Sequence, residues 1–270
     1  MRRHVDNWRG AGARIALVPT MGALHDGHLT LIREAAARAD RVVVSIFVNP
    51  TQFAPHEDFA RYPRDLARDA ELLNRMGLAD LVYAPGVAEV YPSGFATSVR
   101  VEGPATGLEA DFRPHFFRGV ATVVTKLFLQ CRPDVAVFGE KDYQQLLVVR
   151  RLARDLDLQI DVAGVATLRE PDGLALSSRN AYLTTEQRAI APALAQTLAA
   201  TVARARGGCA IAECEAEGSA ALLVAGFDSV DYVAIRDAET LAPVRDLAGP
   251  RRILAAARLG KTRLIDNISV

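Results

Sequence analysis

The sequence has 270 residues, half of them hydrophobic, which is enough for one large or two modest domains with real cores and excludes a disordered chain. Lysine plus arginine equal aspartate plus glutamate at 32 each, so no global basic field favours nonspecific binding of nucleic acid. Three cysteines without a CxxC spacing argue against a disulfide framework and a zinc site, and the lack of a long apolar run predicts a soluble, unsecreted, cytoplasmic protein with no membrane contact.

Strands and helices alternate over the first part of the chain. Strands are predicted at 14–18, 41–48, 79–83, 135–138 and 159–163, and helices in a stretch that ends at 40, around 65–76, at 119–131 and at 143–155. This alternation predicts an α/β fold with a Rossmann-like, doubly wound parallel sheet that helices cover on both faces. A ligand of such a sheet binds at the carboxyl ends of its strands.

Two histidines, His25 and His28, follow the first strand and a glycine turn in the segment 19–28. Leu24, Leu29 and Ile32 continue at helical spacing, so the turn opens a helix whose free N–H groups and dipole favour an anion. The order of strand, glycine turn, HxxH and helix favours a binding site for a nucleotide triphosphate. Taken alone, the pair is also compatible with metal ligands or with solvated histidines, although no third ligand lies nearby at metal spacing.

Polar residues also follow two later strands. Asn49 and Gln52, with the aromatic Phe53, leave the second strand, where they could bind a small hydroxylated substrate or simply form a turn. Lys141 follows a further strand and offers a cation, although a solvated surface lysine is the alternative. All of these residues fall at the edge where a parallel sheet binds its ligand.

The pattern changes near Glu170, which predicts a hinge between a nucleotide-binding domain at 1–169 and a smaller α+β lid domain at 170–270. Thr184 and Gln187 form a capping box before an alanine-rich helix that runs to about 206. A second helical stretch to 225 and short strands at 230–235, 252–257 and 262–265 follow. Just past the hinge, the segment 176–180 offers two hydroxyls and a guanidinium that suit phosphate oxygens, unless it is an ordinary turn.

Taken together, these motifs resemble the pantothenate synthetase (pantoate–β-alanine ligase) family, and HxxH resembles the HIGH element of the nucleotidyltransferase superfamily. The resemblance covers nearly the whole chain, including the segments 62–64, 119–124, 139–145, 231–233 and 262–267. It implies that D-pantoate and β-alanine are joined through a pantoyl-adenylate, with ATP as substrate, Mg²⁺ as cofactor and a homodimer as the assembly.

The resemblance also implies the roles of individual residues. Around ATP it places Met21, His25, His28, Gly139, Lys141, Asp142, Ser177, Ser178 and Arg179. Around pantoate it places Asn49, Gln52, Phe53, Arg113 and Gln145, and it assigns Asp69 to magnesium. We expect His25, His28, Lys141, Arg179 and the ion to neutralise the charge that develops when one anion attacks another.

The sequence departs from the family in two places. The family reads Arg-Pro-Gly-His-Phe where this chain reads Arg113-Pro114-His115-Phe116-Phe117, so no role is carried onto His115. The family also usually begins with an extra strand and more of a helix ahead of the segment that corresponds to residues 6–10, so either the start of this sequence is misassigned or an edge strand is missing. We expect a missing strand to affect stability or dimer contacts, whereas the site motifs are intact.

Two other functions share parts of this pattern. A nucleotidyltransferase that keeps the nucleotide on its product would use the same HxxH but needs a basic pocket for an acceptor phosphate, which the amides of Asn49, Gln52 and Gln145 do not suggest. A nucleotide- or RNA-binding module without catalysis is disfavoured because only 6% of the residues are aromatic and both histidines are present.

Overall fold

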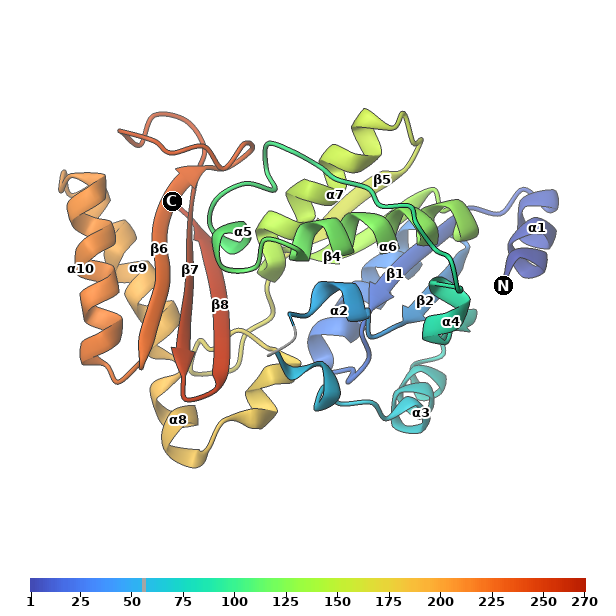
Figure 1. Ribbon diagram of the computed structural model, residues 1–270, viewed down its shortest axis with the longest axis horizontal. Helices are drawn as coiled ribbons and strands as arrows, with labels where there is room; N and C mark the ends of the chain where they lie inside the picture. The colour runs from blue at the N-terminus through green and yellow to red at the C-terminus, as the bar shows by residue number, and fades with distance from the viewer. Residues whose placement is uncertain (55–56) are drawn as a thin grey trace.

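The computed structural model describes residues 1–54 and 57–270. Over that range the chain forms a parallel sheet of five strands in the order β3-β2-β1-β4-β5 and an antiparallel sheet of three in the order β6-β7-β8 (Figure 1). The strands are β1 (Ile15–Thr20), β2 (Arg41–Ile46), β3 (Leu81–Tyr83), β4 (Val135–Gly139), β5 (Asp161–Val165), β6 (Ser229–Asp237), β7 (Arg251–Leu259) and β8 (Thr262–Ser269). The predicted class, a doubly wound parallel sheet with a smaller α+β part, is confirmed.

Helices cover both faces of the large sheet because alternate residues of its strands point to opposite sides. In β1, Ile15 and Leu17 pack under the helices at 116–131 and 143–155, whereas Ala16 and Val18 pack under the helices at 26–38 and 66–76. The helices of this part are α1 (Arg2–Gly10), α2 (Asp26–Arg38), η1 (Pro50–Gln52), η2 (Asp58–Ala60), α3 (Leu66–Met76), α4 (Val87–Val90), α5 (Glu109–Phe112), α6 (Phe116–Cys131), η3 (Glu140–Asp142) and α7 (Tyr143–Asp155).

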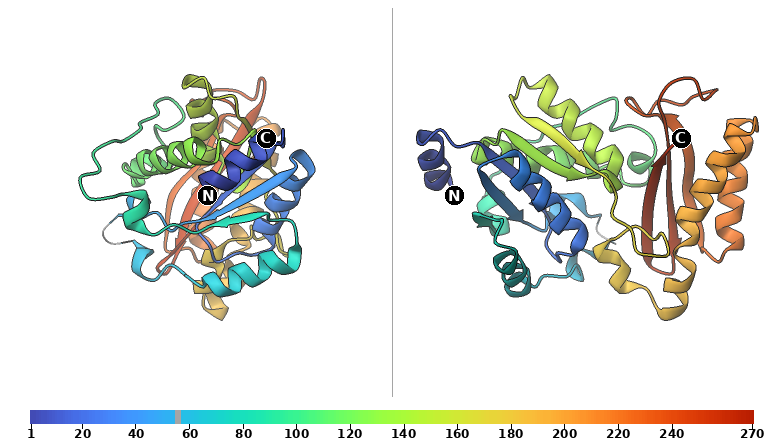
Figure 2. Two further views of the ribbon diagram at one scale, coloured as in Figure 1. Left: turned by 90° about the vertical axis from the view of Figure 1, so that its right-hand side faces the viewer. Right: turned by 180° about the vertical axis from the view of Figure 1, so that it is seen from behind.

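The small sheet carries its own helices on the face that points away from the large sheet (Figures 1 and 2). These are α9 (Ala193–Arg206) and α10 (Ile211–Val224), preceded by η4 (Ser178–Tyr182) and α8 (Thr185–Ile190). Leu198 and Leu222 of these helices pack on Ile253 of β7. Leu254 packs with Leu108 and Leu147 of the first part, so an apolar contact joins the two parts of the molecule.

One predicted helix is wrong in extent. The alanine-rich stretch after Thr184 forms two helices, because Pro192 lacks the N–H that a continuous helix needs and its ring crowds the preceding turn. The capping box at its start is confirmed: the Gln187 N–H donates to Thr184 Oγ1 at 3.2 Å, and the Thr184 N–H donates to Gln187 Oε1 at 3.1 Å. The four-residue helices α4 and α5 were not predicted, since they are too short to show periodicity.

The topology places the predicted site residues at one edge. Strands β1, β2 and β4 are parallel neighbours, so the turns that follow Thr20, Ile46 and Gly139 leave the sheet on the same side. Within the described part of the chain, no helix has the length and apolar character needed to cross a membrane.

Candidate active site

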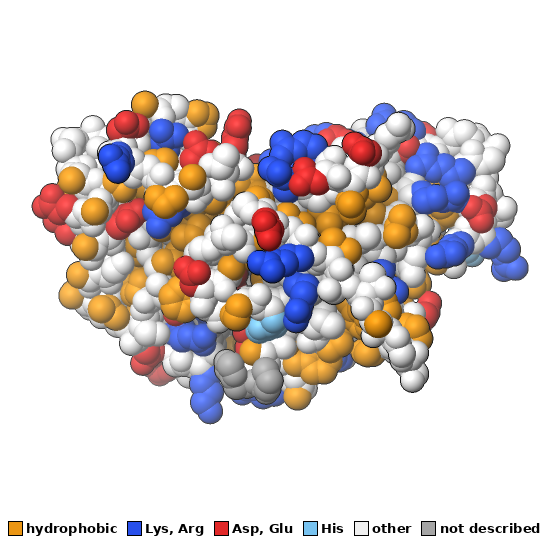
Figure 3. Space-filling model, turned by 45° about the horizontal axis from the view of Figure 1, so that its top comes forward, with side chains coloured by type: hydrophobic (Ala, Val, Ile, Leu, Met, Phe, Trp, Pro, Cys, Tyr) orange, Lys and Arg blue, Asp and Glu red, His pale blue; other side chains and the backbone are white. Residues whose placement is uncertain are grey.

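A cavity of about 880 Å³ lies between the two parts of the molecule, at the carboxyl ends of the parallel strands. On the face shown in Figure 3 a notch separates these parts, and hydrophobic side chains show inside it. Most of the predicted site residues line the cavity, namely Met21, His25, His28, Gln52, Phe53, Arg113, Gly139, Lys141, Asp142, Gln145, Ser177, Ser178 and Arg179. Asn49 and Asp69 do not line it; each is only 1% exposed, behind the cavity wall.

The histidine turn, residues 21–28, connects β1 to α2 and uses its two imidazoles as helix caps. The Gly27 N–H donates to His25 Nδ1 at 3.1 Å, and the His25 N–H donates to His28 Nδ1 at 3.3 Å. Because a backbone N–H can only donate, Nδ1 of each ring carries no proton, and each neutral ring therefore holds its proton on Nε2. The turn thus offers two Nε2–H donors.

Gly27 is required for this arrangement. A Cβ at that position would lie 2.8 Å from His25 Cε1, so any other residue would displace the ring from the cap. The two imidazole centroids lie 4.2 Å apart. The glycine in the HxxH segment therefore shapes the histidine pair as well as the backbone.

The histidines of the turn are uncharged. Burial, then His25 and then Lys141 lower the pKa of His28 to about 3. Burial and Lys141 also lower the pKa of His25. The lowered pKa values and the capping contacts favour neutral rings that donate hydrogen bonds, so we expect most of the positive charge around an anion here to come from other side chains.

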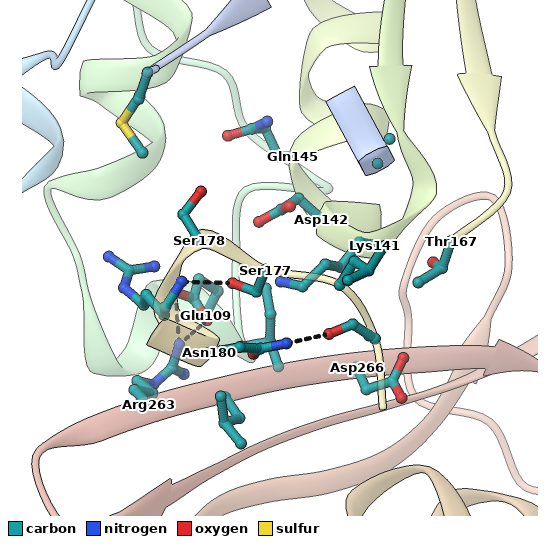
Figure 4. Close-up of a pocket in the computed structure, with 18 of the residues that line it drawn as sticks. Glu109, Lys141, Asp142, Gln145, Thr167, Ser177, Ser178, Asn180, Arg263 and Asp266 are labelled. Carbon is teal, nitrogen blue, oxygen red and sulfur yellow. Dashed lines mark hydrogen bonds and ion pairs between the residues drawn. The ribbon is translucent and has the colours of Figure 1, made fainter. Parts of the chain in front are cut away.

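Lys141 and the serine segment approach the same space from opposite sides. Lys141 lies in η3 after β4, and Ser177 and Ser178 begin η4 in the second part of the chain; Figure 4 shows Lys141 and Ser177 converging. Ser178 Oγ donates to the carbonyl of Ala23 at 3.2 Å, which ties this segment to the histidine turn. Asn267 Nδ2 donates to the carbonyls of Glu140 and Lys141 at 2.9 Å and 2.8 Å, so β8 supports the lysine turn.

Gln52 is oriented by Asn49. Asn49 Nδ2 donates to the Gly119 carbonyl at 3.1 Å and to Gln52 Oε1 at 2.9 Å, while Asn49 Oδ1 accepts the Tyr91 hydroxyl at 2.9 Å. The Gly119 carbonyl can only accept, which settles the orientation of the Asn49 amide and therefore that of Gln52. Gln52 consequently presents its amide N–H groups, as donors, to the cavity. Asn49 acts behind the wall and not in it.

Arg113 belongs to a buried group of charges that we call the arginine network: Glu57, Glu109, Arg113, Asp231 and Arg263. Arg113 pairs with Glu57 at 2.8 Å and with Glu109 at 2.9 Å. Arg263 of β8 pairs with Glu109 at 2.7 Å and with Asp231 at 2.6 Å. Burial of Glu109 opposes its ionisation, yet Arg263 and Arg113 outweigh that effect and hold the pKa of Glu109 below its usual value.

The network spans the two parts of the molecule and bears on the departure at Phe116. The Arg113 guanidinium also donates to the Gln52 carbonyl at 2.9 Å and lies 4.0 Å from the centre of the Phe116 ring. The phenyl ring that replaces the family histidine therefore supports the face of this arginine. Arg113 lines the cavity as a paired side chain that fixes the wall near Gln52.

Asp69 faces the histidine turn. Its carboxylate oxygens accept the Ala23 and Leu24 N–H groups, both at 2.9 Å. Among the described residues, no group of three or more His, Cys, Asp or Glu side chains is arranged to hold a metal ion. A carboxylate that is 1% exposed and engaged at both oxygens does not fit a magnesium ligand.

Comparison with known proteins decides the family. A profile of the pantoate-beta-alanine ligase family matches residues 1–269. The chain belongs to the pantoate–β-alanine ligase family. The pantothenate synthetase of Paramagnetospirillum magneticum is 60% identical over 270 residues, which are 100% of this chain and 95% of that protein.

Two solved structures of this ligase family share the fold. The pantothenate synthetase of Thermus thermophilus has a TM-score of 0.91 at 51% identity, over 98% of this chain and 96% of that one. The pantoate-beta-alanine ligase of Francisella tularensis, which was solved with beta-gamma ATP and beta-alanine, has a TM-score of 0.81 at 33% identity, over 99% and 95%. The chain is accordingly an ATP-dependent ligase whose activity joins pantoate to β-alanine.

Several residues that shape this ligase site were missed from the sequence. Glu109 stands four residues before Arg113, which is the spacing of an ion pair on one helix turn, so its contact was within reach of sequence reasoning. Arg263, which is 154 residues from Glu109, and Asn267 lie in a segment that matches the family but carried no assigned role. Tyr91 gave no signal, because it acts through Asn49.

Proposed function

We propose that the cavity ligates pantoate and β-alanine in two steps. In the first step the pantoate carboxylate attacks the α-phosphate of ATP, which gives pantoyl-adenylate and releases pyrophosphate. In the second step the amine of β-alanine attacks the acyl carbon, and AMP leaves. The intermediate is needed because an amine cannot displace oxide from a free carboxylate, whereas AMP is a good leaving group.

The observation that carries the proposal is the tautomer of the histidine turn. With both Nδ1 atoms used as caps, His25 and His28 aim Nε2–H groups at the site of an anion next to the N-terminus of α2. Lys141 and Arg179 supply positive charge to the phosphates, and Ser177 and Ser178 supply hydroxyls. Met21, Gly139 and Asp142 form the remaining wall around the nucleotide.

The pantoate end is served by amides and an apolar wall. Gln52 donates its amide N–H groups to hydroxyl or carboxylate oxygens of pantoate, and Gln145, which Figure 4 shows projecting into the cavity, assists. Phe53, 8% exposed and stacked edge-on with Tyr62, covers the dimethyl group of pantoate. Asn49 and Arg113 contribute by fixing Gln52. Asn49 donates to the side chain of Gln52, and Arg113 donates to its backbone carbonyl.

Magnesium enters the proposal as part of the nucleotide substrate. A divalent ion bound to ATP phosphates would offset their charge when bound and needs no protein cage. The described residues contribute N–H and ammonium donors to the phosphates and no cluster of carboxylates.

The segment 170–270 acts in this proposal as a lid on the domain 1–169. Support comes from the contacts across the cavity, where Ser178 reaches Ala23 and Asn267 reaches Lys141. A homodimer and a cytoplasmic location are further predictions that follow from the family resemblance.

The test follows the two half-reactions separately. The purified protein is incubated with ATP, Mg²⁺ and D-pantoate while pyrophosphate release is measured, and β-alanine is then added while AMP and pantothenate are measured. We expect a first release that depends on pantoate and turnover that depends on β-alanine. Pyrophosphate release without pantoate, or a nucleotide retained on the product, would point to a nucleotidyltransferase instead.

A further inference from the structure

Asp69 makes an unusual contact for a residue in the first turn of α3. Its side chain leaves the helix and accepts the N–H groups of Ala23 and Leu24, two successive residues of the histidine turn. The residue is 1% exposed and does not line the cavity. The carboxylate therefore acts on the backbone that carries His25, from the side opposite to any ligand.

The turn needs such a contact because its backbone is strained. Gly22 has φ of +82° and Ala23 has φ of +51°, so two residues in a row adopt the left-handed region, and Ala23 does so with a side chain. Successive N–H groups in this conformation point to one side and form a concave site for an anion. If the carboxylate were removed, two N–H groups of the turn would lose their acceptor, which would destabilise this conformation of the backbone.

The strained turn also fixes what surrounds it. A Cβ at Gly22 would lie 3.0 Å from Asp69 Oδ2 and 3.1 Å from Ile46 Cγ2, so the turn is packed tightly between α3 and β2. Leu24 is 1% exposed in the core, and His25 follows it directly. On the other side, the Ala23 carbonyl accepts the Ser178 hydroxyl. The position of the Ala23 peptide thus sets both the histidine caps and the contact with the serine segment.

We propose that Asp69 is a positioning residue for nucleotide activation: it holds the Ala23–Leu24 backbone so that His25, His28 and the Ala23 carbonyl keep their places, and it does not coordinate magnesium. The proposal rests on the proposed function in so far as the histidines face ATP.

The variant Asp69→Asn tests this, with Asp65→Asn as the matched control. Asparagine keeps the size of the side chain but turns an NH₂ group toward a backbone N–H. Asp65 caps the same helix through the Arg68 N–H, a task that asparagine performs equally well. Pantoate-dependent pyrophosphate release is measured against Mg²⁺ concentration at saturating ATP, at least 10 °C below the Tm of the least stable variant.

We expect kcat of Asp69→Asn to fall about tenfold or more while the Mg²⁺ concentration at half-saturation stays within about twofold of the wild type. Adding Ala23→Gly, which removes the strain at residue 23, restores part of the loss if Asp69 acts through the turn. A tenfold rise in the Mg²⁺ requirement with normal kcat at high Mg²⁺, or an unchanged kcat, overturns the proposal.

A second measurement separates this proposal from the proposed function. Histidine ring protons are titrated by NMR without ATP or Mg²⁺, with His25→Asn and His28→Asn used for assignment. In Asp69→Asn and in the charge-conserving Asp69→Glu, a loosened turn raises the low pKa values of His25 and His28, whereas loss of a metal ligand leaves them unchanged in metal-free buffer. Unchanged titrations overturn the positioning role whatever the enzyme's substrate, and absent turnover in the wild type counts against the proposed function alone.

Discussion

The histidine turn and the arginine network border the same cavity but keep their polar groups in different ways. In the turn, two neutral imidazoles cap backbone N–H groups, and the buried Asp69 holds the backbone. In the network, two guanidiniums pair with three carboxylates, so the ionised groups hold one another and leave one negative charge in excess. The tautomer of the two histidines is thus set by local backbone contacts and their neutral state by burial, whereas in the network the charged groups pair with one another and hold the cavity wall.

The largest effect on stability is expected when Glu109, which pairs with both arginines of the network, is removed. Glu109→Ala removes the carboxylate that two guanidiniums share and leaves each with one partner, Glu57 or Asp231, so we expect the free energy of unfolding to fall by about 3 kcal/mol, the low end for a broken buried pair. Chemical denaturation measures this. Glu102→Ala, which removes a carboxylate from an exposed pair with Arg100, is the control and should change little. Equal stabilities of the two variants would show that the buried ion pairs of the network do not stabilise the fold.

The turn should respond in activity and not in stability. In His28→Asn the amide oxygen replaces Nδ1 as acceptor for the His25 N–H, but nothing replaces Nε2–H. We expect pantoate-dependent pyrophosphate release to fall about 100-fold, because a donor aimed at developing charge is lost, with little change in Tm. His28→Ala also removes the acceptor for the His25 N–H, so we expect both a lower rate of pyrophosphate release and a lower Tm. Normal pyrophosphate release in His28→Asn would remove the Nε2 donor from the mechanism.

Acid should lower the free energy of unfolding more in the wild type than in His28→Asn. The pKa of His28 is lowered to about 3, so the unfolded chain binds a proton below pH 6.5 that the folded protein takes up only near pH 3. The free energy of unfolding therefore decreases as pH falls from 6.5, and at about pH 5 the wild type should have lost about 2 kcal/mol more than His28→Asn. Carboxylates of the network titrate in both proteins and cancel. Parallel stability curves would contradict the assigned charge state.

The smallest effect is expected at Tyr91, which is linked to Gln52 by two hydrogen bonds through Asn49. Tyr91→Phe removes the hydroxyl that donates to Asn49, and the loss of this hydrogen bond costs about 1 kcal/mol. We therefore expect a roughly fivefold rise in KM for pantoate, with KM for ATP unchanged. Tyr83→Phe, whose hydroxyl contacts the exposed Glu89, serves as the control. A rise in both KM values would indicate a general loss of structure.

The sequence predicted local features well and distant contacts poorly. The helix at 143–155 was predicted with the bounds that α7 has, because its hydrophobic period is regular and a polar turn precedes it. Pro192 was read as part of a helix although its missing N–H breaks one. His25 and His28 were predicted as ligands of phosphate, but their neutral state depends on burial and on Lys141, which lies more than a hundred residues away in the sequence. The pairing of Glu109 with Arg263 depends on how the two parts meet, and no pattern along the chain encodes that.

The hydrogen bonds from Asn267 of β8 to the carbonyls of Glu140 and Lys141 bear on whether the first part of this enzyme can be used as a separate fragment. Lys141, to which we assign a role at the nucleotide, lies on a turn whose carbonyls accept hydrogen bonds from strand β8. A fragment that ends at residue 169 would keep all five strands of the parallel sheet and both histidines yet leave that turn without its support. We therefore expect residues 1–169 alone to hold this turn less firmly, and any redesign of that part has to keep or replace its contact with β8.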